Sequence, residues 1–215
     1  MSGRRIVRYR FGERMVHWAA AVSYVYLLLT GLAFWTPALY WIAIVLGGGF
    51  LTRAMHPWAG VFFTAIVVWM WAMWRRDMRV SAADREWRAA MGYYIRNEDA
   101  RVPAAGRFNY GQKSLFWVMV WGAVALLVSG LVLWVPDAVP RELRILREAA
   151  ILVHAVSALV TIAGFIVHLY MSIAVVPGGL SAMTHGEVTE EWARHHHPGW
   201  LDELRERGTR GQPLT

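Results

Sequence analysis

Four long stretches of the sequence contain no Asp, Glu, Lys or Arg, and they constrain the fold more than any other feature. They cover residues 15–52, 54–74, 114–136 and 149–186. An α-helix needs about 20 mostly apolar residues to cross the ~30 Å hydrocarbon layer of a membrane. The stretches therefore predict an all-α integral membrane protein, built as a bundle of four transmembrane helices.

The first and last stretches are too long for a single crossing, and prolines divide them. Pro37 is expected to end the first helix near Trp35, which leaves residues 38–52 as an interfacial or re-entrant segment. Pro177, followed by two glycines, is expected to end the fourth helix. The predicted spans are residues 15–36, 54–74, 114–135 and 149–176. Together they make one domain, residues 15–176, between an N-terminal arm (1–14) and a C-terminal tail (177–215).

The basic residues are distributed unevenly between the two sides of such a bundle. Four crossings put both termini on one side, together with the loop between the second and third spans. That side carries 18 of the 22 Lys and Arg residues, and the opposite side carries 4. By the positive-inside rule, both termini are predicted to be cytoplasmic. The net charge of +7 is thus explained by membrane topology, and no nucleic-acid partner is expected.

The composition agrees with a membrane protein and limits the chemistry. Hydrophobic residues make up 57% of the chain and charged residues 17%, against about 45–50% and about 25% in soluble domains. The 13 Trp residues are typical of membrane–water interfaces. The chain has no cysteine, which excludes disulfides, thiolate-held iron–sulfur clusters and covalently attached haem within it. Any metal or haem must be held by other side chains.

A shorter amphipathic pattern lies between the second and third spans. Residues 84–96 place Trp87, Met91 and Tyr94 at helical spacing, with charges between them. This predicts a short helix on the cytoplasmic membrane surface. A loop helix that contacts a partner protein explains the pattern equally well.

Four of the eight histidines lie in or at the ends of the predicted spans: His17, His56, His154 and His168. A lone histidine at membrane depth is often only hydrogen-bonded to a neighbouring helix. Four that form matched pairs indicate a function, because ionisable side chains are costly in the bilayer.

The spacing of the histidines predicts which ones pair. His154 and His168 are 14 residues apart, so on one helix they face nearly the same way, about 21 Å apart along the axis. Depth then pairs His17 with His168 near the cytoplasmic face, and His56 with His154 near the periplasmic face. Each pair is placed to clamp a planar ligand between facing helices.

Haem b is the ligand that fits these pairs best, and two haems b are predicted. Neutral imidazole binds iron well, and filling both axial positions favours electron transfer over oxygen chemistry. Zinc normally requires additional ligands that these depths lack, and a proton relay would require intramembrane carboxylates. Small residues near the histidines, Gly31, Gly60 and Gly164, leave room for a flat ring or simply for close helix packing.

The remaining histidines follow the last span. The run at residues 195–197 has the composition of a metal-binding tract, but a solvated tail that contacts a partner is the preferred interpretation.

With the histidines placed, the chain resembles the gamma, or cytochrome b, subunit of membrane-bound bacterial formate dehydrogenases. The resemblance covers nearly the whole chain, and its most discriminating part is the FN-x-GQK motif before the third span. It rests on Arg8-Tyr9, Phe11, His17-Trp18, His56-Pro57, Phe108–Lys113, His154, His168 and the tail segment Glu191–Pro198.

The resemblance implies membership of a larger complex in the bacterial inner membrane. A periplasmic subunit that contains molybdenum or tungsten would oxidise formate, and an iron–sulfur subunit would deliver the electrons to this cytochrome. Quinone would be reduced near the cytoplasmic face, with Asn109, Gly111, Gln112 and the haem ligand His168 at its pocket. The chain itself would be an electron-transfer subunit and not the catalyst of formate oxidation.

The quinone assignment has a plainer alternative. Amide side chains donate hydrogen bonds to carbonyl groups, and glycine permits close backbone approach. Asn109-Tyr110-Gly111 also has the composition of a turn that precedes a helix.

Two other functions compete with the formate dehydrogenase assignment. One is the cytochrome b of a related complex, such as a nickel–iron hydrogenase or a thiosulfate reductase. The other is a haem-free membrane anchor or small transporter, whose histidines would bind substrate or protons.

Overall fold

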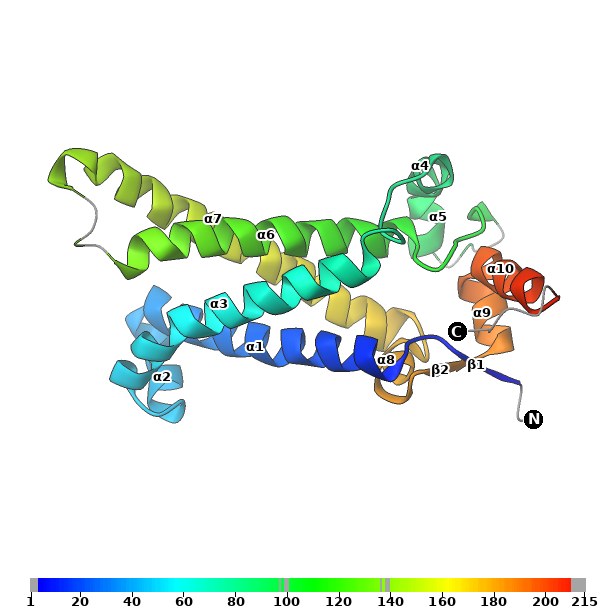
Figure 1. The fold of residues 1–215 in the computed structure, drawn as a ribbon, viewed down its shortest axis with the longest axis horizontal. Coiled ribbons are helices and arrows are strands. Elements are labelled where there is room, and N and C mark those ends of the chain that lie inside the picture. The colour runs from blue at the N-terminus through cyan, green and yellow to red at the C-terminus, as the bar shows by residue number, and fades with distance from the viewer. Residues whose placement is uncertain (1–3, 97, 99–100, 136, 138–139, 210–215) are drawn as a thin grey trace. The chain divides into compact units, whose positions relative to one another are not determined.

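A computed structural model describes residues 4–96, 98, 101–135, 137 and 140–209. Four long helices dominate it (Figure 1). They are α1 (Phe11–Trp35), α3 (Gly49–Trp74), α6 (Tyr110–Trp134) and α7 (Arg144–Tyr170). Among the described residues, four helices are long and apolar enough to cross a membrane, which confirms the predicted number of spans.

The helices begin earlier than the uncharged stretches do. Helix α3 begins at Gly49 and includes Arg53, and α7 begins at Arg144 and includes Glu148. The predicted spans were bounded by the nearest charged residue. Backbone hydrogen bonding continues through charged residues at helix ends, so the helices are longer. Long charged side chains there reach the membrane–water interface.

Large apolar side chains cover the outside of these helices. Val22 is 69% exposed, Trp69 61% and Ile166 60%. Soluble proteins rarely expose apolar surface on this scale, so a nonpolar solvent around the helices is required.

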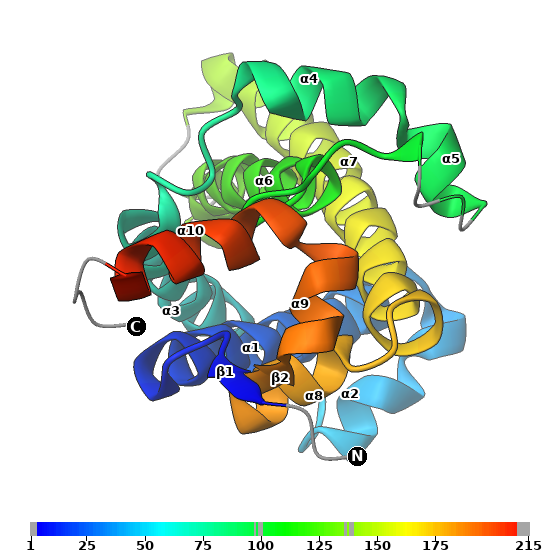
Figure 2. The ribbon, with the colours of Figure 1, turned by 90° about the vertical axis from the view of Figure 1, so that its right-hand side faces the viewer.

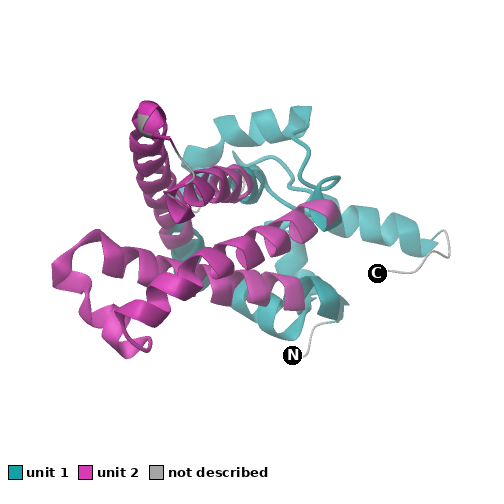
Figure 3. Cartoon of the chain, turned by 60° about the vertical axis from the view of Figure 1, so that its left-hand side comes forward, with its two compact units in different colours: residues 1–14, 73–117, 167–215 teal, residues 15–72, 118–166 magenta. Residues whose placement is uncertain are grey.

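The chain divides into two compact units (Figure 3). Unit 1 comprises residues 1–14, 73–117 and 167–215, and unit 2 comprises residues 15–72 and 118–166. The core of unit 2 consists of small and aromatic side chains from three of the long helices: Ala20, Tyr24, Phe63, Val67 and Ala123.

Buried hydroxyl groups in unit 2 share one local arrangement. Thr64 Oγ1 donates to the Gly60 carbonyl oxygen at 2.9 Å, and Ser23 Oγ donates to the Ala19 carbonyl oxygen at 2.7 Å. Such bonds to the preceding turn satisfy a hydroxyl where water is absent.

The segment after α1 folds back in unit 2. A short 3₁₀ turn at Pro37–Leu39 leads into α2 (Trp41–Val45), whose Ile42 and Ala43 pack with Ala33. Gly47 and Gly48 then adopt φ values of 100° and 97°, a left-handed conformation that favours glycine and ends the short helix. The prediction that α1 ends near Trp35 is confirmed, and the membrane depth of the returning segment stays a prediction.

In unit 1, the N-terminal arm pairs with the tail. Strand β1 (Arg5–Val7) runs antiparallel to β2 (Glu187–Thr189), and the strands lie side by side in Figure 2. The tail also forms α8 (Gly179–His185), α9 (Glu190–His196) and α10 (Pro198–Thr209). The architecture is all-α, as predicted, and this two-stranded ribbon is a small addition to it. Three-residue strands are too short to produce an alternating pattern in the sequence.

The predicted helix over residues 84–96 forms as two pieces. They are α4 (Ala82–Ala89) and α5 (Met91–Ile95), separated at Ala90. Ser81 and Asp84 form a reciprocal capping box at the start of α4, and Trp87 is only 4% exposed. Contact of this segment with the membrane surface stays a prediction.

Candidate functional site

The four intramembrane histidines lie on the helices where the sequence places them. His17 is on α1, His56 is on α3, and His154 and His168 are both on α7. His17, His56 and His154 belong to unit 2, and His168 belongs to unit 1.

Within unit 2, the rings of His56 and His154 face each other. Their centroids are 6.4 Å apart and their planes are inclined by 58°. Metal–imidazole bonds are about 2.0–2.1 Å long, and the ring centroid lies about 1.2 Å beyond the nitrogen, so two imidazoles on opposite sides of one metal have centroids about 6.4 Å apart. The predicted partners are therefore brought together at the separation that a shared metal requires.

A buried hydroxyl group contacts a ring nitrogen of each of these two histidines. Thr30 Oγ1 lies 2.7 Å from His56 Nδ1, and Ser129 Oγ lies 2.9 Å from His154 Nδ1. Thr30 is 0% exposed and Ser129 is 3% exposed. In both rings the hydroxyl group contacts Nδ1, and the His154 ring also hydrogen-bonds to the backbone of Leu126. Nε2 is the nitrogen that we propose for a ligand.

A glycine follows each hydroxyl residue and leaves space beside the ring. A Cβ atom at Gly130 would lie 3.3 Å from His154 Cε1, and one at Gly31 would lie 3.9 Å from His56 Cε1. A side chain at Gly130 would press against the His154 imidazole, whereas one at Gly31 would make an ordinary contact with the His56 ring. At Gly60, such a Cβ atom would have no other atom within 4 Å. That Gly31 and Gly60 make room for a flat ring stays a prediction.

The sequence prediction missed Thr30, Ser129 and Gly130, although a short signal for them exists. Residues 27–35 read LLLTGLAFW, and residues 126–134 read LLVSGLVLW. Five of the nine positions are identical, and the hydroxyl residue and the glycine occupy the same places in both segments. The repeat is too short to stand out without the histidine contacts.

The other predicted pair, His17 with His168, stays a prediction. A π-helical turn at Met171–Val175 begins three residues after His168, in place of further α-helix. Such turns occur frequently at functional sites.

Asn109 and Gln112 form a reciprocal cap at the start of α6, in unit 1. Asn109 Oδ1 accepts a hydrogen bond from the Gln112 backbone N–H at 2.9 Å, and Gln112 Oε1 accepts one from the Asn109 backbone N–H at 3.0 Å. The side-chain oxygens of Asn109 and Gln112 thus serve the start of a helix, as the plainer alternative proposed. Both amide nitrogens keep their N–H groups, which can donate to a carbonyl group.

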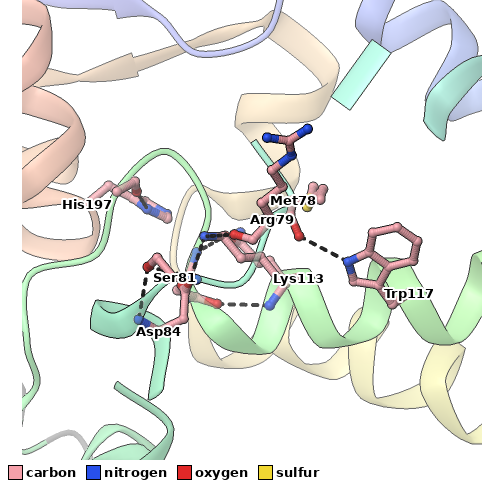
Figure 4. A network of polar contacts seen from close by, with 10 residues as sticks. Met78, Arg79, Ser81, Asp84, Lys113, Trp117 and His197 are labelled. Atoms are coloured by element: carbon pink, nitrogen blue, oxygen red, sulfur yellow. Dashed lines mark hydrogen bonds and ion pairs between the residues drawn. The ribbon is translucent and has the colours of Figure 1, made fainter. Parts of the chain in front are cut away.

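Lys113, the last residue of the FN-x-GQK motif, connects α6 to α4 (Figure 4). Its Nζ lies 2.7 Å from Asp84 Oδ2 and donates to the Arg79 carbonyl oxygen at 3.1 Å. The Lys113 and Asp84 side chains are only 11% and 8% exposed. Burial by itself raises the pKa of Asp84, but the hydrogen bonds from Lys113 and Ser81 outweigh it and hold this pKa below its ordinary value.

A second ion network in unit 1 surrounds Arg107. Its guanidinium group contacts Glu13 at 2.6 Å and Asp77 at 2.7 Å, and Trp74 Nε1 donates to the same Glu13 carboxylate. Burial lowers the pKa of Arg107, but the two carboxylates outweigh it and raise this pKa above its ordinary value. This network fixes the segment that enters α1.

His197 corrects the prediction of a solvated histidine tail. It is 2% exposed, its Nδ1 donates to the Gly106 carbonyl oxygen at 2.8 Å, and its Nε2 lies 3.3 Å from Arg8 Nη2. Arg8 is itself buried, with Trp200 as the nearest of the four aromatic rings around it. Burial first, and then the charge of Arg8, lower the pKa of His197 well below its ordinary value. The solvated-tail prediction is wrong for His197, because its contacts join residues far apart in the sequence, whereas His195 is exposed.

Burial of neutral His197 is expected to make the protein less stable in mild acid. Above about pH 6.5, this histidine is neutral in both the folded and the unfolded chain. Below pH 6.5, the unfolded chain binds a proton that the folded chain excludes, so the free energy of unfolding falls by up to about 1.4 kcal/mol per pH unit. Equilibrium unfolding in detergent at pH 7.5 and pH 5.5 measures this slope.

His197→Gln should flatten that pH dependence, and His195→Gln is the matched control because His195 is exposed. A parent slope equal to that of His197→Gln would contradict the assignment. The neighbouring charges, Arg8 and His196, remain in every variant.

His195 and His196 line a cavity of about 590 Å³ in unit 1, together with Tyr94, Glu191, Trp192 and residues 175–177. Within the described part of the chain, no group of three or more His, Cys, Asp or Glu side chains is placed to hold a metal ion.

Comparison with known proteins shows which family the chain belongs to. The chain matches the prokaryotic cytochrome b561 family over residues 8–186. It is 33% identical over 201 residues to the cytochrome b556(fdo) subunit of formate dehydrogenase from Escherichia coli, covering 93% of both chains. It is also 33% identical to the Haemophilus influenzae formate dehydrogenase cytochrome b556 subunit, over 93% of this chain and 83% of that one. The nitrate-inducible cytochrome b556(Fdn) subunit of Escherichia coli is 28% identical over 94% of this chain and 93% of its own length.

These similarities confirm the resemblance found in the sequence. Family membership implies haem b as the cofactor, and with the four apolar helices it indicates a protein of the bacterial inner membrane. The chain belongs to the prokaryotic cytochrome b561 family and is a relative of the cytochrome b556 subunits of formate dehydrogenase.

Proposed function

We propose that this chain is the dihaem cytochrome b subunit of a formate dehydrogenase complex, and that it carries electrons across the membrane to quinone. The observation that carries the proposal is the facing pair His56 and His154, with ring centroids 6.4 Å apart. The curated relatives named above, which are formate dehydrogenase cytochrome subunits, favour this complex over a hydrogenase or a thiosulfate reductase. The paired rings in turn favour it over a haem-free anchor or transporter.

The protein's part in the chemistry is to hold and insulate the cofactor. His56 and His154 would hold the periplasmic-side haem, and His17 and His168 the cytoplasmic-side haem. Held by two imidazoles, each haem would supply single-electron transfer and would offer no position for oxygen chemistry. Apolar side chains pack in the core of unit 2, and Gly130 leaves space beside the His154 ring.

The direction of transfer follows from the proposed topology. With both termini cytoplasmic, His56 and His154 lie on the periplasmic side, where an iron–sulfur subunit bound to a molybdenum or tungsten subunit would deliver electrons. Quinone reduction on the cytoplasmic side would take protons from the cytoplasm. Moving one charge against 100 mV requires about 2.3 kcal/mol, so this transfer would conserve energy as membrane potential.

Asn109, Gly111 and Gln112 are proposed to bind quinone. The side-chain oxygens of Asn109 and Gln112 accept the hydrogen bonds of the helix cap, so the side-chain N–H groups of these two residues are the donors for a quinone carbonyl. Gly111 presents no side chain: a Cβ atom there would meet only Asn109 Oδ1, at 3.4 Å. The cap fixes the position of both amide groups before quinone arrives.

This double role allows a test that separates binding from folding. Gln112→Glu and Asn109→Asp both keep a capping oxygen, because Glu and Asp are good residues at these positions, but both remove the amide donor. Loss of one hydrogen bond to a neutral acceptor costs about 0.5–1.5 kcal/mol. Quinone-driven reoxidation should therefore slow by about two- to tenfold, with haem content and stability unchanged.

Stopped-flow reoxidation with a quinone analogue measures the effect, and Gln112→Ala reports the additional loss of the cap. Normal reoxidation in both acidic variants would place the quinone elsewhere, with the periplasmic side to be searched next.

A further inference from the structure

We infer that Thr30 and Ser129 are positioning residues that fix the tautomer of His56 and His154 and set the reduction potential of the haem that these histidines hold. The inference rests on the proposed function, since it concerns the ligands of the proposed periplasmic-side haem. Its basis is the pair of buried contacts, 2.7 Å and 2.9 Å long, between each hydroxyl oxygen and the ring nitrogen Nδ1.

The direction of these hydrogen bonds follows from what else each hydroxyl contacts. Thr30 Oγ1 lies 2.9 Å from the Tyr26 carbonyl oxygen, and Ser129 Oγ lies 2.6 Å from the Ala125 carbonyl oxygen. A carbonyl oxygen only accepts, so the single hydroxyl proton is directed to it. The hydroxyl oxygen then accepts the proton of Nδ1–H, and Nε2 is left with its lone pair. A histidine that binds iron through Nε2 requires this tautomer.

Ordinary hydrogen bonding in membrane helices does not explain the arrangement. Hydroxyl groups in such helices commonly donate to the preceding turn, as Ser23 and Thr64 do in the same unit. Thr30 and Ser129 make that bond and also contact an imidazole nitrogen. The second contact distinguishes them, and it occurs once for each ring of the facing pair.

The arrangement is also repeated in the sequence. Thr30 precedes His56 by 26 residues, and Ser129 precedes His154 by 25 residues. Each hydroxyl residue is followed by a glycine that borders the same ring. Two helical hairpins, α1–α3 and α6–α7, thus present a histidine supported by a hydroxyl–glycine pair from the preceding helix. Because the same hydroxyl–glycine arrangement occurs beside both His56 and His154, we assign it the same role toward the ligand that the two histidines would share.

The physical effect is on the electron-donating strength of the ligand. An acceptor on Nδ1–H makes the imidazole a stronger donor through Nε2, and a stronger donor favours ferric over ferrous iron. Removing the acceptor should favour the ferrous form and raise the reduction potential. A neutral hydroxyl is a modest acceptor, so the effect should be a fraction of that produced by a carboxylate.

Thr30→Val and Ser129→Ala test the inference, because both remove the hydroxyl with little change in volume. Each should shift the ferric–ferrous equilibrium of one haem by about three- to tenfold, equivalent to about 30–60 mV upward for one electron. Spectroelectrochemical titration of the purified protein measures the shift. Electron paramagnetic resonance should show altered g-values for the same haem. Thr30→Ser keeps the hydroxyl and should behave as the parent protein.

Thr64→Val is the matched control, because Thr64 is also buried in unit 2 and its hydroxyl donates to the Gly60 carbonyl oxygen. Unchanged potentials and g-values in both test variants would overturn the inference. If Thr30→Val loses the haem, restoration by Thr30→Ser would support the hydroxyl's role, and failure of that rescue would overturn it. Absence of haem from the parent protein would instead contradict the proposed function.

Discussion

Replacement of His154 by alanine is expected to lower the haem content of the purified protein from two haems b to one. The His154 and His56 ring centroids are 6.4 Å apart, and the haem that the two residues would hold together would lose one of its two protein ligands. His56→Ala should remove the same haem. Pyridine haemochrome analysis gives the content, and the potential of the remaining haem identifies which one is lost. His195→Ala, in the exposed part of the tail, should retain both haems.

Double variants make the test of pairing sharper. A protein that carries both His56→Ala and His154→Ala should still bind one haem, because both substitutions affect the same site. A protein that carries His17→Ala and His154→Ala should bind none. Loss of both haems from the His56/His154 double variant would show that these two histidines serve different sites, and the depth argument would then be wrong.

The second large effect is expected at Lys113, in the protein's stability. Lys113→Met removes one partner of a 2.7 Å ion pair whose side chains are only 11% and 8% exposed. An uncompensated buried carboxylate costs about 3–5 kcal/mol, so the free energy of unfolding should fall by that amount. Equilibrium unfolding in detergent measures it. Arg5→Ala, which breaks an exposed pair with Glu187, should cost at most about 1 kcal/mol.

A double-mutant cycle with Asp84→Asn isolates the interaction between the two side chains. Asp84 also accepts a hydrogen bond from the Ser81 backbone N–H at the start of α4, and Asn keeps an oxygen that can accept it, so the substitution removes mainly the charge. The Lys113→Met/Asp84→Asn protein should be more stable than the sum of the single effects predicts. Strictly additive losses would show that the pair is not coupled in the folded protein.

The sequence predicted the features that depend on local pattern. The four spans follow from the length of uncharged stretches, and the end of α1 at Trp35 follows from Pro37. The nearness of the His56 and His154 rings followed from their depths, because a helix converts sequence spacing into height and the four crossings set which ends are level. That the two histidines share a haem stays a prediction.

Contacts between distant segments could not be predicted in this way. The pairing of β1 with β2 joins residues 180 to 184 positions apart, and burial of His197 depends on Arg8 and Gly106. The same limit applies to Thr30 and Ser129. A hydroxyl in a membrane helix usually bonds to its own backbone, so only the position of the neighbouring helix reveals the imidazole.

The haem content of the unmodified protein tests the central claim most directly. Pyridine haemochrome analysis of fully loaded, purified protein should give two haems b per polypeptide, with low-spin spectra in the oxidised and the reduced states. A value of one would leave a histidine pair without its proposed cofactor. A value of zero would contradict the cytochrome function itself.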